Sequence, residues 1–343
     1  GELTKDHYTI AVSGTHGKST TTAMIGLLLT KAGLDPTVIV GTKLKEFGNS
    51  NYRVGESKYL VIEADEYAAS FLNYSPDIIV LTSLEADHLD YYGTFEKIFE
   101  TFQKYLACLK EGGHIVFNGD DGNIAELVKG KDNTHSYSLQ EVAASQVKSI
   151  LQIPGKHNVS NALAALHAAS LLEISKDTTL KALSQFTGTW RRFEIFELYA
   201  PHPYTLVSDY GHHPTEISAT IQAAREKWPE KDIWLVYQPH QYHRTFALFD
   251  DFVTTLSSLP INRLIIADIY DVAGREDSDI RKQVSSERLA REIAQKESHP
   301  DTVLHITPQE SIADYLEQEI TGGEIVLVMG AGTIYDLTLQ LTR

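Results

Sequence analysis

The chain has 343 residues, of which 42% are hydrophobic and 22% charged, a length that predicts about two domains with cores of their own. Its 30 basic and 46 acidic side chains give a formal net charge of −16, which argues against nucleic-acid binding, because phosphate contacts need clustered Lys and Arg. Cys108 is the only cysteine, so an intramolecular disulfide framework and a zinc site of several thiolates are excluded.

Short β-branched runs alternate with helical patterns, as is typical of a parallel sheet covered by helices. In the first half we expect strands at residues 9–13, 37–40, 59–63, 78–82 and 114–118, with helices at 19–32 and 95–109. In the second half we expect strands at 205–209, 233–237, 264–268 and 324–329, with helices near 214–228, 245–257 and 285–296. The segment FTGTWRR (186–192) contains glycine and threonine, which interrupt helices, so we place the domain boundary in this segment. We expect domains at 1–188 and 189–343.

The first expected strand runs into a glycine-rich turn that opens a helix, in the stretch IAVSGTHGKST at 10–20. Backbone N–H groups of such a turn point into one concavity, and the helix N-terminus adds partial positive charge. Lys18, taken as an exposed side chain, would reach the terminal phosphates of a nucleotide, and Ser19 could bind Mg²⁺. Val12 stands where the Walker pattern has glycine. We expect a nucleoside triphosphate site, against the alternative of a solvated turn.

Acidic side chains and a histidine follow the next strands, in EADE at 63–66 and EADHLD at 85–90. These positions are the carboxyl ends of parallel strands, where open α/β sheets bind ligands. Mg²⁺ prefers a few carboxylate oxygens with water and phosphate, so one carboxylate with Ser19 would hold a first ion, and a histidine a second. For four of the acids, helix capping or surface pairing is an equal alternative: Asp65, Glu66, Glu85 and Asp90.

Seven blocks, in order along the chain, resemble the Mur ligase family, the ATP-dependent amide ligases of peptidoglycan precursor synthesis. The blocks are GTHGKSTT (14–21), EADEYAASFL (63–72), TSLEADHLDYYG (82–93), GKHNVSNALAA (155–165), TWRRFE (189–194), DYGHHPTE (209–216) and QPHQYHRT (238–245). The resemblance implies an α/β fold: a central ATPase domain of P-loop type with a mostly parallel sheet, followed by a Rossmann-like α/β domain.

The resemblance also implies roles for residues of the first domain. The phosphates would lie on the turn and the helix start, at Gly14, Thr15, Gly17, Lys18, Ser19 and Thr20. Ser19 and Glu63 would hold the first Mg²⁺, and His88 the second. The adenine would contact the block that contains His157, Asn158 and Asn161, although asparagines at the start of an Ala-rich helix commonly cap it.

In the second domain the resemblance implies that Arg192 reaches the phosphates and that Asp209 contacts the ribose. Tyr210, His212 and Arg244 would frame the incoming amino acid. The alternative for His212 is a polar turn before a helix that begins at Pro214. The segment Gly330–Gly332 resembles half of a dinucleotide fingerprint, but Tyr335 stands where its third glycine should be, and we interpret it as a strand-to-helix turn.

The implied reaction joins L-alanine, or a similar small amino acid, to UDP-N-acetylmuramate through an acyl phosphate and a tetrahedral intermediate, with release of ADP and phosphate. The implied catalytic residues are Lys18, His88, Arg192 and His212. No apolar run approaches the roughly 18 residues that span a bilayer, and no leader opens the chain. We therefore expect a soluble, cytoplasmic monomer or homodimer that binds ATP and Mg²⁺ and has no membrane or nucleic-acid partner.

Several positions depart from the family pattern. Ser83 stands in place of Asn, Ser208 in place of Asp, and Gln241 in place of an arginine that would clamp the amino-acid carboxylate. The segment 268–277 is unusual as well. These departures leave open which amino acid is added.

Two other functions are open at this point. One is a recycling ligase of the same superfamily, which joins a preformed peptide to UDP-N-acetylmuramate. The other is a nucleotide-binding module without ligase activity. Family members place a UDP-binding domain ahead of the phosphate loop, and this sequence begins shortly before that loop with Gly1. We therefore expect the chain to be a truncated form.

Overall fold

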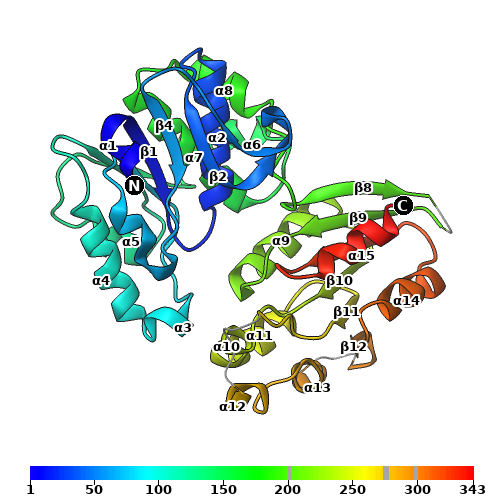
Figure 1. Ribbon diagram of the computed structural model, residues 1–343. Helices are drawn as coiled ribbons and strands as arrows, with labels where there is room; N and C mark the ends of the chain where they lie inside the picture. Colours follow the sequence, from blue (N-terminus) through cyan, green and yellow to red (C-terminus); the bar gives the residue numbers. More distant parts are fainter. Residues whose placement is uncertain (200–201, 273–277, 297–299) are drawn as a thin grey trace. The chain divides into compact units, whose positions relative to one another are not determined.

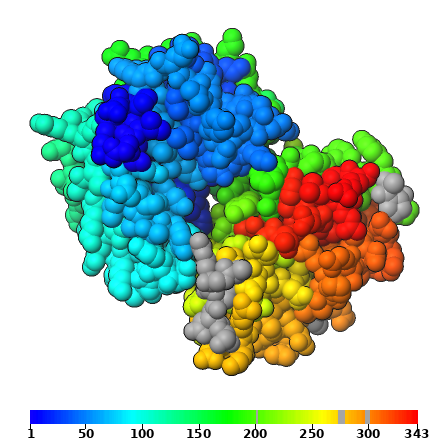
Figure 2. Space-filling view, viewed as in Figure 1, coloured from blue at the N-terminus to red at the C-terminus, as the bar shows by residue number. Residues whose placement is uncertain are grey.

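The computed structural model describes residues 1–199, 202–272, 278–296 and 300–343, and the chain forms two compact units, Gly1–Trp190 and Arg191–Arg343 (Figure 1). The division lies two residues after the boundary expected at 188. In the described parts, every helix is too short or too polar to cross a membrane. In the space-filling view, the first helix (dark blue) lies on the surface of the first unit and the last helix (red) on that of the second (Figure 2).

The first unit is built on a seven-stranded sheet with the order β3-β2-β4-β1-β5-β6-β7. Its strands run parallel except for the pair of β2 and β3. They span β1 Tyr8–Ser13, β2 Thr37–Leu44, β3 Ser50–Arg53, β4 Tyr59–Glu63, β5 Ile78–Leu81, β6 His114–Asn118 and β7 Thr134–Tyr137. Val12 pairs with Glu63 and Ser13 with Leu81, so β1, β4 and β5 end at one edge of the sheet.

Helices cover both faces of this sheet. They are α1 Glu2–Asp6, α2 Lys18–Lys31, α3 Leu89–Tyr92, α4 Phe95–Leu106, α5 Gly122–Leu127, α6 Val142–Ile150, α7 Lys156–Leu171 and α8 Lys176–Leu183, with 3₁₀ turns at Lys45–Phe47 and Tyr67–Asn73. Side chains alternate along β1: Ile10 and Val12 join the core under α2, α6, α7 and α8, whereas Ala11 joins the core under α4 and α5.

The second unit repeats this plan with a six-stranded sheet of order β12-β11-β10-β13-β9-β8, in which only β8 and β9 pair antiparallel. Its strands are β8 Glu194–Leu198, β9 Tyr204–Asp209, β10 Ile233–Tyr237, β11 Arg263–Ile266, β12 Val303–His305 and β13 Ile325–Met329. Its helices are α9 Pro214–Lys227, α10 Tyr242–Ala247, α11 Phe249–Leu256, α12 Ser278–Arg281, α13 Ser286–Lys296, a 3₁₀ turn at Pro300–Thr302, α14 Ser311–Glu319 and α15 Ile334–Leu341.

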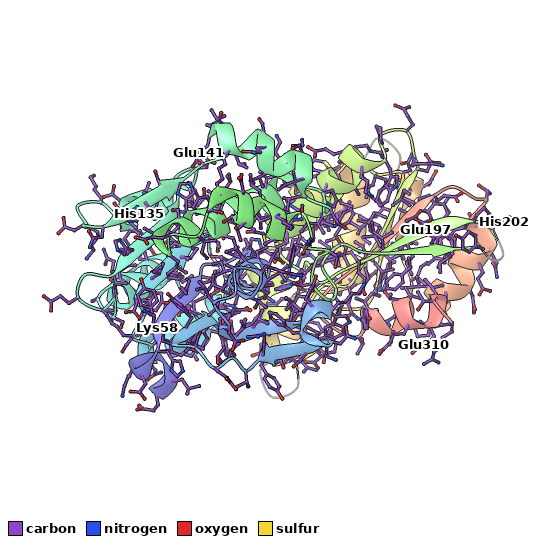
Figure 3. All side chains as sticks on the ribbon, turned by 90° about the horizontal axis from the view of Figure 1, so that it is seen from above. Lys58, His135, Glu141, Glu197, His202 and Glu310 are labelled. Atoms are coloured by element: carbon purple, nitrogen blue, oxygen red, sulfur yellow. The ribbon has the colours of Figure 1, made fainter. Side chains whose placement is uncertain are left out.

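The predicted fold class, α/β with mostly parallel sheets, is confirmed in both units. The helix expected at 245–257 is instead two helices, α10 and α11, that meet at Leu248. The four strands that we did not predict, β3, β7, β8 and β12, are the outer strands of the two sheets. They are short and carry polar side chains such as His135 on β7 and Glu197 on β8, both labelled in Figure 3. Edge strands lack the continuous apolar run that marks a strand buried on both faces.

Helix α2 is buried without interruption from Thr20 to Leu29. A Cβ atom added at Gly26 would lie 2.9 and 3.0 Å from the two Cγ atoms of Val38 on β2. The close packing of α2 on the sheet therefore needs glycine at this position.

We expect Gly26→Ala to destabilise the first unit by about 1–3 kcal/mol, because overpacking outweighs the gain of about 1 kcal/mol in helix propensity. Urea unfolding followed by circular dichroism measures the change. Gly122→Ala, at an exposed helix position with open space around its Cβ, is the matched control and should not destabilise. Equal stability of the two variants would contradict the packing argument.

Candidate functional site

The turn between β1 and α2 has a backbone that only glycine tolerates at two positions. Gly14 has φ +136° and Gly17 has φ +83°. A Cβ at Gly14 would lie 2.3 Å from the Thr82 hydroxyl oxygen, and one at Gly17 would lie 2.4 Å from Asn161 Oδ1. The two glycines therefore let the turn pack closely on the segment after β5 and on α7.

Ser83 holds the turn in place. Its carbonyl accepts the N–H of Thr15 at 2.9 Å and its hydroxyl accepts the N–H of His16 at 2.8 Å. The Thr15 hydroxyl in turn accepts the N–H of Glu85 at 2.8 Å. The serine that departs from the family pattern thus anchors the loop, a role that the sequence did not indicate.

The start of α2 is suited to an anion. Gly17 is its N-cap residue and provides no side-chain cap to the first-turn N–H groups. The first N–H groups of a helix have no partner within the helix, and the helix dipole places partial positive charge there. Residues 17–20 therefore offer the N–H cradle that the phosphate-loop prediction requires.

Lys18 is not the exposed side chain that we expected. It is only 13% exposed, and Nζ lies 2.7 Å from the carbonyl of Gly14, 3.2 Å from that of Thr15 and 3.0 Å from Glu66 Oε1. Burial lowers the pKa of the Lys18 ammonium, but the nearby carboxylates of Glu66, Glu63 and Asp65 outweigh burial, so the pKa is raised. The lysine is therefore a charged, buried partner of a carboxylate.

Ser19 and Glu63 lie together beside the turn. The Ser19 hydroxyl donates to Glu63 Oε1 at 2.9 Å, and Glu63 Oε2 accepts the N–H of Gly41 at 2.6 Å. One hydroxyl and one carboxylate oxygen next to a phosphate cradle match the hard oxygen ligands that Mg²⁺ prefers. These residues fit the expected first ion.

A second ligand group includes Glu66, the carboxylate that Lys18 contacts. Asp65, Glu66 and His88 each offer one ligand atom, and these atoms lie within 4.8 Å of one another. His88 Nε2 is 3.8 Å from Glu66 Oε1, and its ring lies 5.0 Å from that of Tyr67. The donor set fits a second divalent cation, with Glu66 in addition to the predicted His88.

The predicted adenine block forms the first turns of α7. Its N-cap is Gly155, so the alternative that an asparagine is the N-cap residue is wrong. Asn158 donates to the carbonyl of Pro154 at 2.6 Å, and the Asn161 side chain lies against Gly17. His157 is half-buried in the same turn. Asn161 therefore joins the phosphate turn, whereas the adenine contacts stay a prediction.

In the second unit, Asp209 ends β9 and is 6% exposed. Its two carboxylate oxygens accept the N–H groups of Gly211 at 2.7 Å and Phe193 at 2.8 Å. Asp209 therefore fixes the backbone on both sides of it. Its contact with a ribose stays a prediction.

Glu216 gathers several of the predicted residues. Its Oε2 accepts the N–H of His212 at 2.9 Å, and its Oε1 accepts from Arg192 at 3.4 Å. The Arg192 guanidinium also lies 5.2 Å from the centre of the Tyr210 ring. His213, rather than His212, is the N-cap of α9 and forms a capping box with Glu216. The spacing HPTE is a capping-box signal that could have singled out Glu216.

Arg244 is 9% exposed on α10. Its Nη1 lies 3.3 Å from His240 Nδ1 and donates to Gln241 Oε1 at 3.5 Å. Gln241 itself is 9% exposed and has φ +71°. The glutamine that replaces the expected arginine therefore directs its amide oxygen at Arg244. This contact positions the Arg244 guanidinium.

The turn Gly330–Gly332 connects β13 to α15, as predicted. A Cβ at Gly332 would lie 2.4 Å from the Tyr270 ring, and Gln238 Oε1 accepts the N–H of Ile334 at 3.0 Å. Tyr270 and Gln238 therefore pack closely against this strand-to-helix turn. Of the unusual segment 268–277, residues 273–277 lie outside the described residues.

Comparison with known proteins gives two family matches. Residues 12–169 match the Mur ligase middle domain, and residues 191–332 match the glutamate ligase domain of Mur ligases. A UDP-N-acetylmuramate–L-alanine ligase of Clostridium tetani is 39% identical over 98% of this chain and 76% of its own length. One of Trichlorobacter lovleyi is 38% identical over 100% of this chain and 78% of its own length.

Solved structures show the same fold. UDP-N-acetylmuramate–alanine ligase of Thermotoga maritima matches with a TM-score of 0.76 at 23% identity, over 99% of this chain and 75% of that protein. The MurF ligase of Thermotoga maritima, solved in complex with ADP, matches with a TM-score of 0.71 at 17% identity, over 99% and 81%.

We expect Lys18→Ala to abolish nucleotide turnover and to lower the free energy of unfolding by about 3–5 kcal/mol, because it leaves the buried Glu66 carboxylate without its ammonium. The double variant Lys18→Ala with Glu66→Gln should regain much of the stability and none of the turnover. Urea unfolding and phosphate release measure the two effects. Normal turnover in Lys18→Ala would exclude it as a phosphate ligand.

Proposed function

Because the chain belongs to the Mur ligase family, we propose that it is an ATP-dependent ligase that joins L-alanine to the carboxylate of UDP-N-acetylmuramate. Two relatives that carry this activity in their names are 38–39% identical over nearly the whole chain. The observation that carries the proposal is the phosphate turn that ends in Lys18, with Ser19 and Glu63 hydrogen-bonded beside it.

A carboxylate is a poor electrophile, so the ligase must first convert it to an acyl phosphate. A carboxylate oxygen of UDP-N-acetylmuramate attacks the γ-phosphorus of ATP, and ADP leaves. Lys18 and the N–H groups at the start of α2 bind the phosphate oxygens on which negative charge gathers. Ser19 and Glu63 would hold one Mg²⁺, and His88 with Asp65 and Glu66 a second. When bound, Mg²⁺ offsets charge on the phosphate oxygens.

The amino group of the amino acid then attacks the acyl carbon, and phosphate leaves from the tetrahedral intermediate. We assign the phosphates to Arg192, the ribose to Asp209, and the amino acid to Tyr210, His212 and Arg244. Support for Arg244 comes from its position between His240 and Gln241, which hold the guanidinium in one place. A fixed guanidinium binds a carboxylate with little loss of side-chain entropy.

We place the reaction in the cytoplasm. The single, half-buried Cys108 supports a reducing compartment. We also propose that the protein is a monomer or homodimer.

The test is release of phosphate from ATP with UDP-N-acetylmuramate and, in turn, L-alanine, glycine, L-serine and a cell-wall tripeptide. We expect release to need UDP-N-acetylmuramate and kcat/KM for L-alanine to exceed that for glycine by about tenfold or more, the effect of one buried methyl group. Release with the tripeptide alone would favour a recycling ligase. Nucleotide binding without release for any amino acid, both in this chain and in a version with a UDP-binding domain ahead of the phosphate loop, would contradict ligase activity.

We expect His88→Ala to raise the Mg²⁺ concentration for half-maximal rate by about tenfold or more, because a metal site loses one of its ligands. The control is His202→Ala, an exposed histidine of the second unit, labelled in Figure 3, which should leave the titration unchanged. An unaltered titration in His88→Ala would remove His88 from the proposed site.

A further inference from the structure

Glu66 is held in the first unit by a contact of its side chain and a contact of its backbone carbonyl. It follows β4, and its carboxylate is 4% exposed. Its backbone carbonyl accepts the hydroxyl of Tyr92, a buried residue of α3. A carboxylate so deeply buried needs a cation next to it. The arrangement of the backbone therefore aims Glu66 at the interior of the phosphate site rather than at solvent.

The cation is Lys18. Its Nζ lies 3.0 Å from Glu66 Oε1 and 2.9 Å from Oε2, and its remaining contacts are the carbonyls of Gly14 and Thr15. An ammonium has three N–H donors, and the hydrogen bonds to Glu66 Oε1 and to the carbonyls of Gly14 and Thr15 use all of them. A nucleotide phosphate can bind Lys18 only by displacing one of these partners. Of these partners, Glu66 is the one that carries a charge, so it competes with the phosphate for the Lys18 ammonium. Its negative charge also repels the phosphate.

A carboxylate that gives up Lys18 needs another cation. Asp65 and His88 lie beside Glu66, with ligand atoms within 4.8 Å of its own. Two carboxylates and an imidazole form a ligand set that suits a divalent cation better than a single monovalent cation. The same carboxylate is therefore shared between Lys18 and the group that would hold a metal ion.

We propose that Glu66 is a positioning residue that couples nucleotide binding to metal binding: it holds Lys18 until a divalent cation takes its carboxylate, and Lys18 is then released to the phosphates. This inference rests on the proposed function. It assigns a task to a residue that the sequence placed equally well in a surface ion pair. The consequence is that metal and nucleotide strengthen each other's binding through the protein, as linkage requires.

The first test measures the affinity for ADP by calorimetry in EDTA, with no divalent cation. We expect Glu66→Gln to bind ADP about tenfold more tightly than the unaltered chain, because the competing charge is gone, and to gain much less from added Mg²⁺. Glu111→Gln, an exposed glutamate of the same unit, is the matched control and should behave as the unaltered chain. Equal ADP affinity in Glu66→Gln and the unaltered chain would overturn the inference.

The second test does not use Glu66→Gln as a single substitution. Binding of Mn²⁺ without nucleotide is followed by electron paramagnetic resonance. Lys18→Ala frees Glu66 and should bind Mn²⁺ about tenfold more tightly than the unaltered chain, whereas the double variant with Glu66→Gln should lose that gain. Equal Mn²⁺ binding in the two variants would also overturn the inference.

The two proposals fail in different ways. An unaltered chain that binds no ADP, with or without Mg²⁺, would contradict the proposed function and this inference with it. An unaltered chain that ligates L-alanine, with Glu66→Gln unchanged in ADP affinity, would contradict the inference alone.

Discussion

The candidate site of the first unit depends on the parallel pairing of β1 with β4 and β5. That register ends the three strands at one edge, so the turn after β1 meets Glu63 at the end of β4 and Ser83 after β5. Each strand delivers a different chemical group: backbone N–H groups, a carboxylate, and the anchor of the turn. A slip of register between any two strands would separate these groups, which belong to segments far apart in the sequence.

In the second unit, buried charged side chains hold the loop after β9 in place. Asp209 ends β9, Glu216 lies in the first turn of α9, and Arg192 precedes β8. Their hydrogen bonds fix the backbone that carries Tyr210 and His212. A buried carboxylate with two backbone donors is satisfied without solvent. In each unit, therefore, ionic groups shape a loop at the carboxyl edge of a parallel sheet, and the apolar strands behind it supply a rigid base.

Much of the fold could be predicted because buried strands such as Ile78–Leu81 are continuous apolar runs and the turn at Gly14 and Gly17 needs residues that have no Cβ. The polar outer strands could not be predicted, because their side chains resemble those of loops. Within the site, the contact between Ser19 and Glu63 agrees with the ligand pairing that the family resemblance implied. The burial of Glu66 and the approach of Asn161 to Gly17 depend on tertiary packing that no local spacing reports.

Helix α2 is buried over ten consecutive residues, from Thr20 to Leu29, and packs on the sheet, on α7 and on α8. Amide protons in such a helix exchange with solvent only when the whole unit opens, whereas edge strands and surface helices open locally. The phosphate turn is continuous with this helix. The N–H groups of the turn are therefore anchored to a part of the unit that opens last.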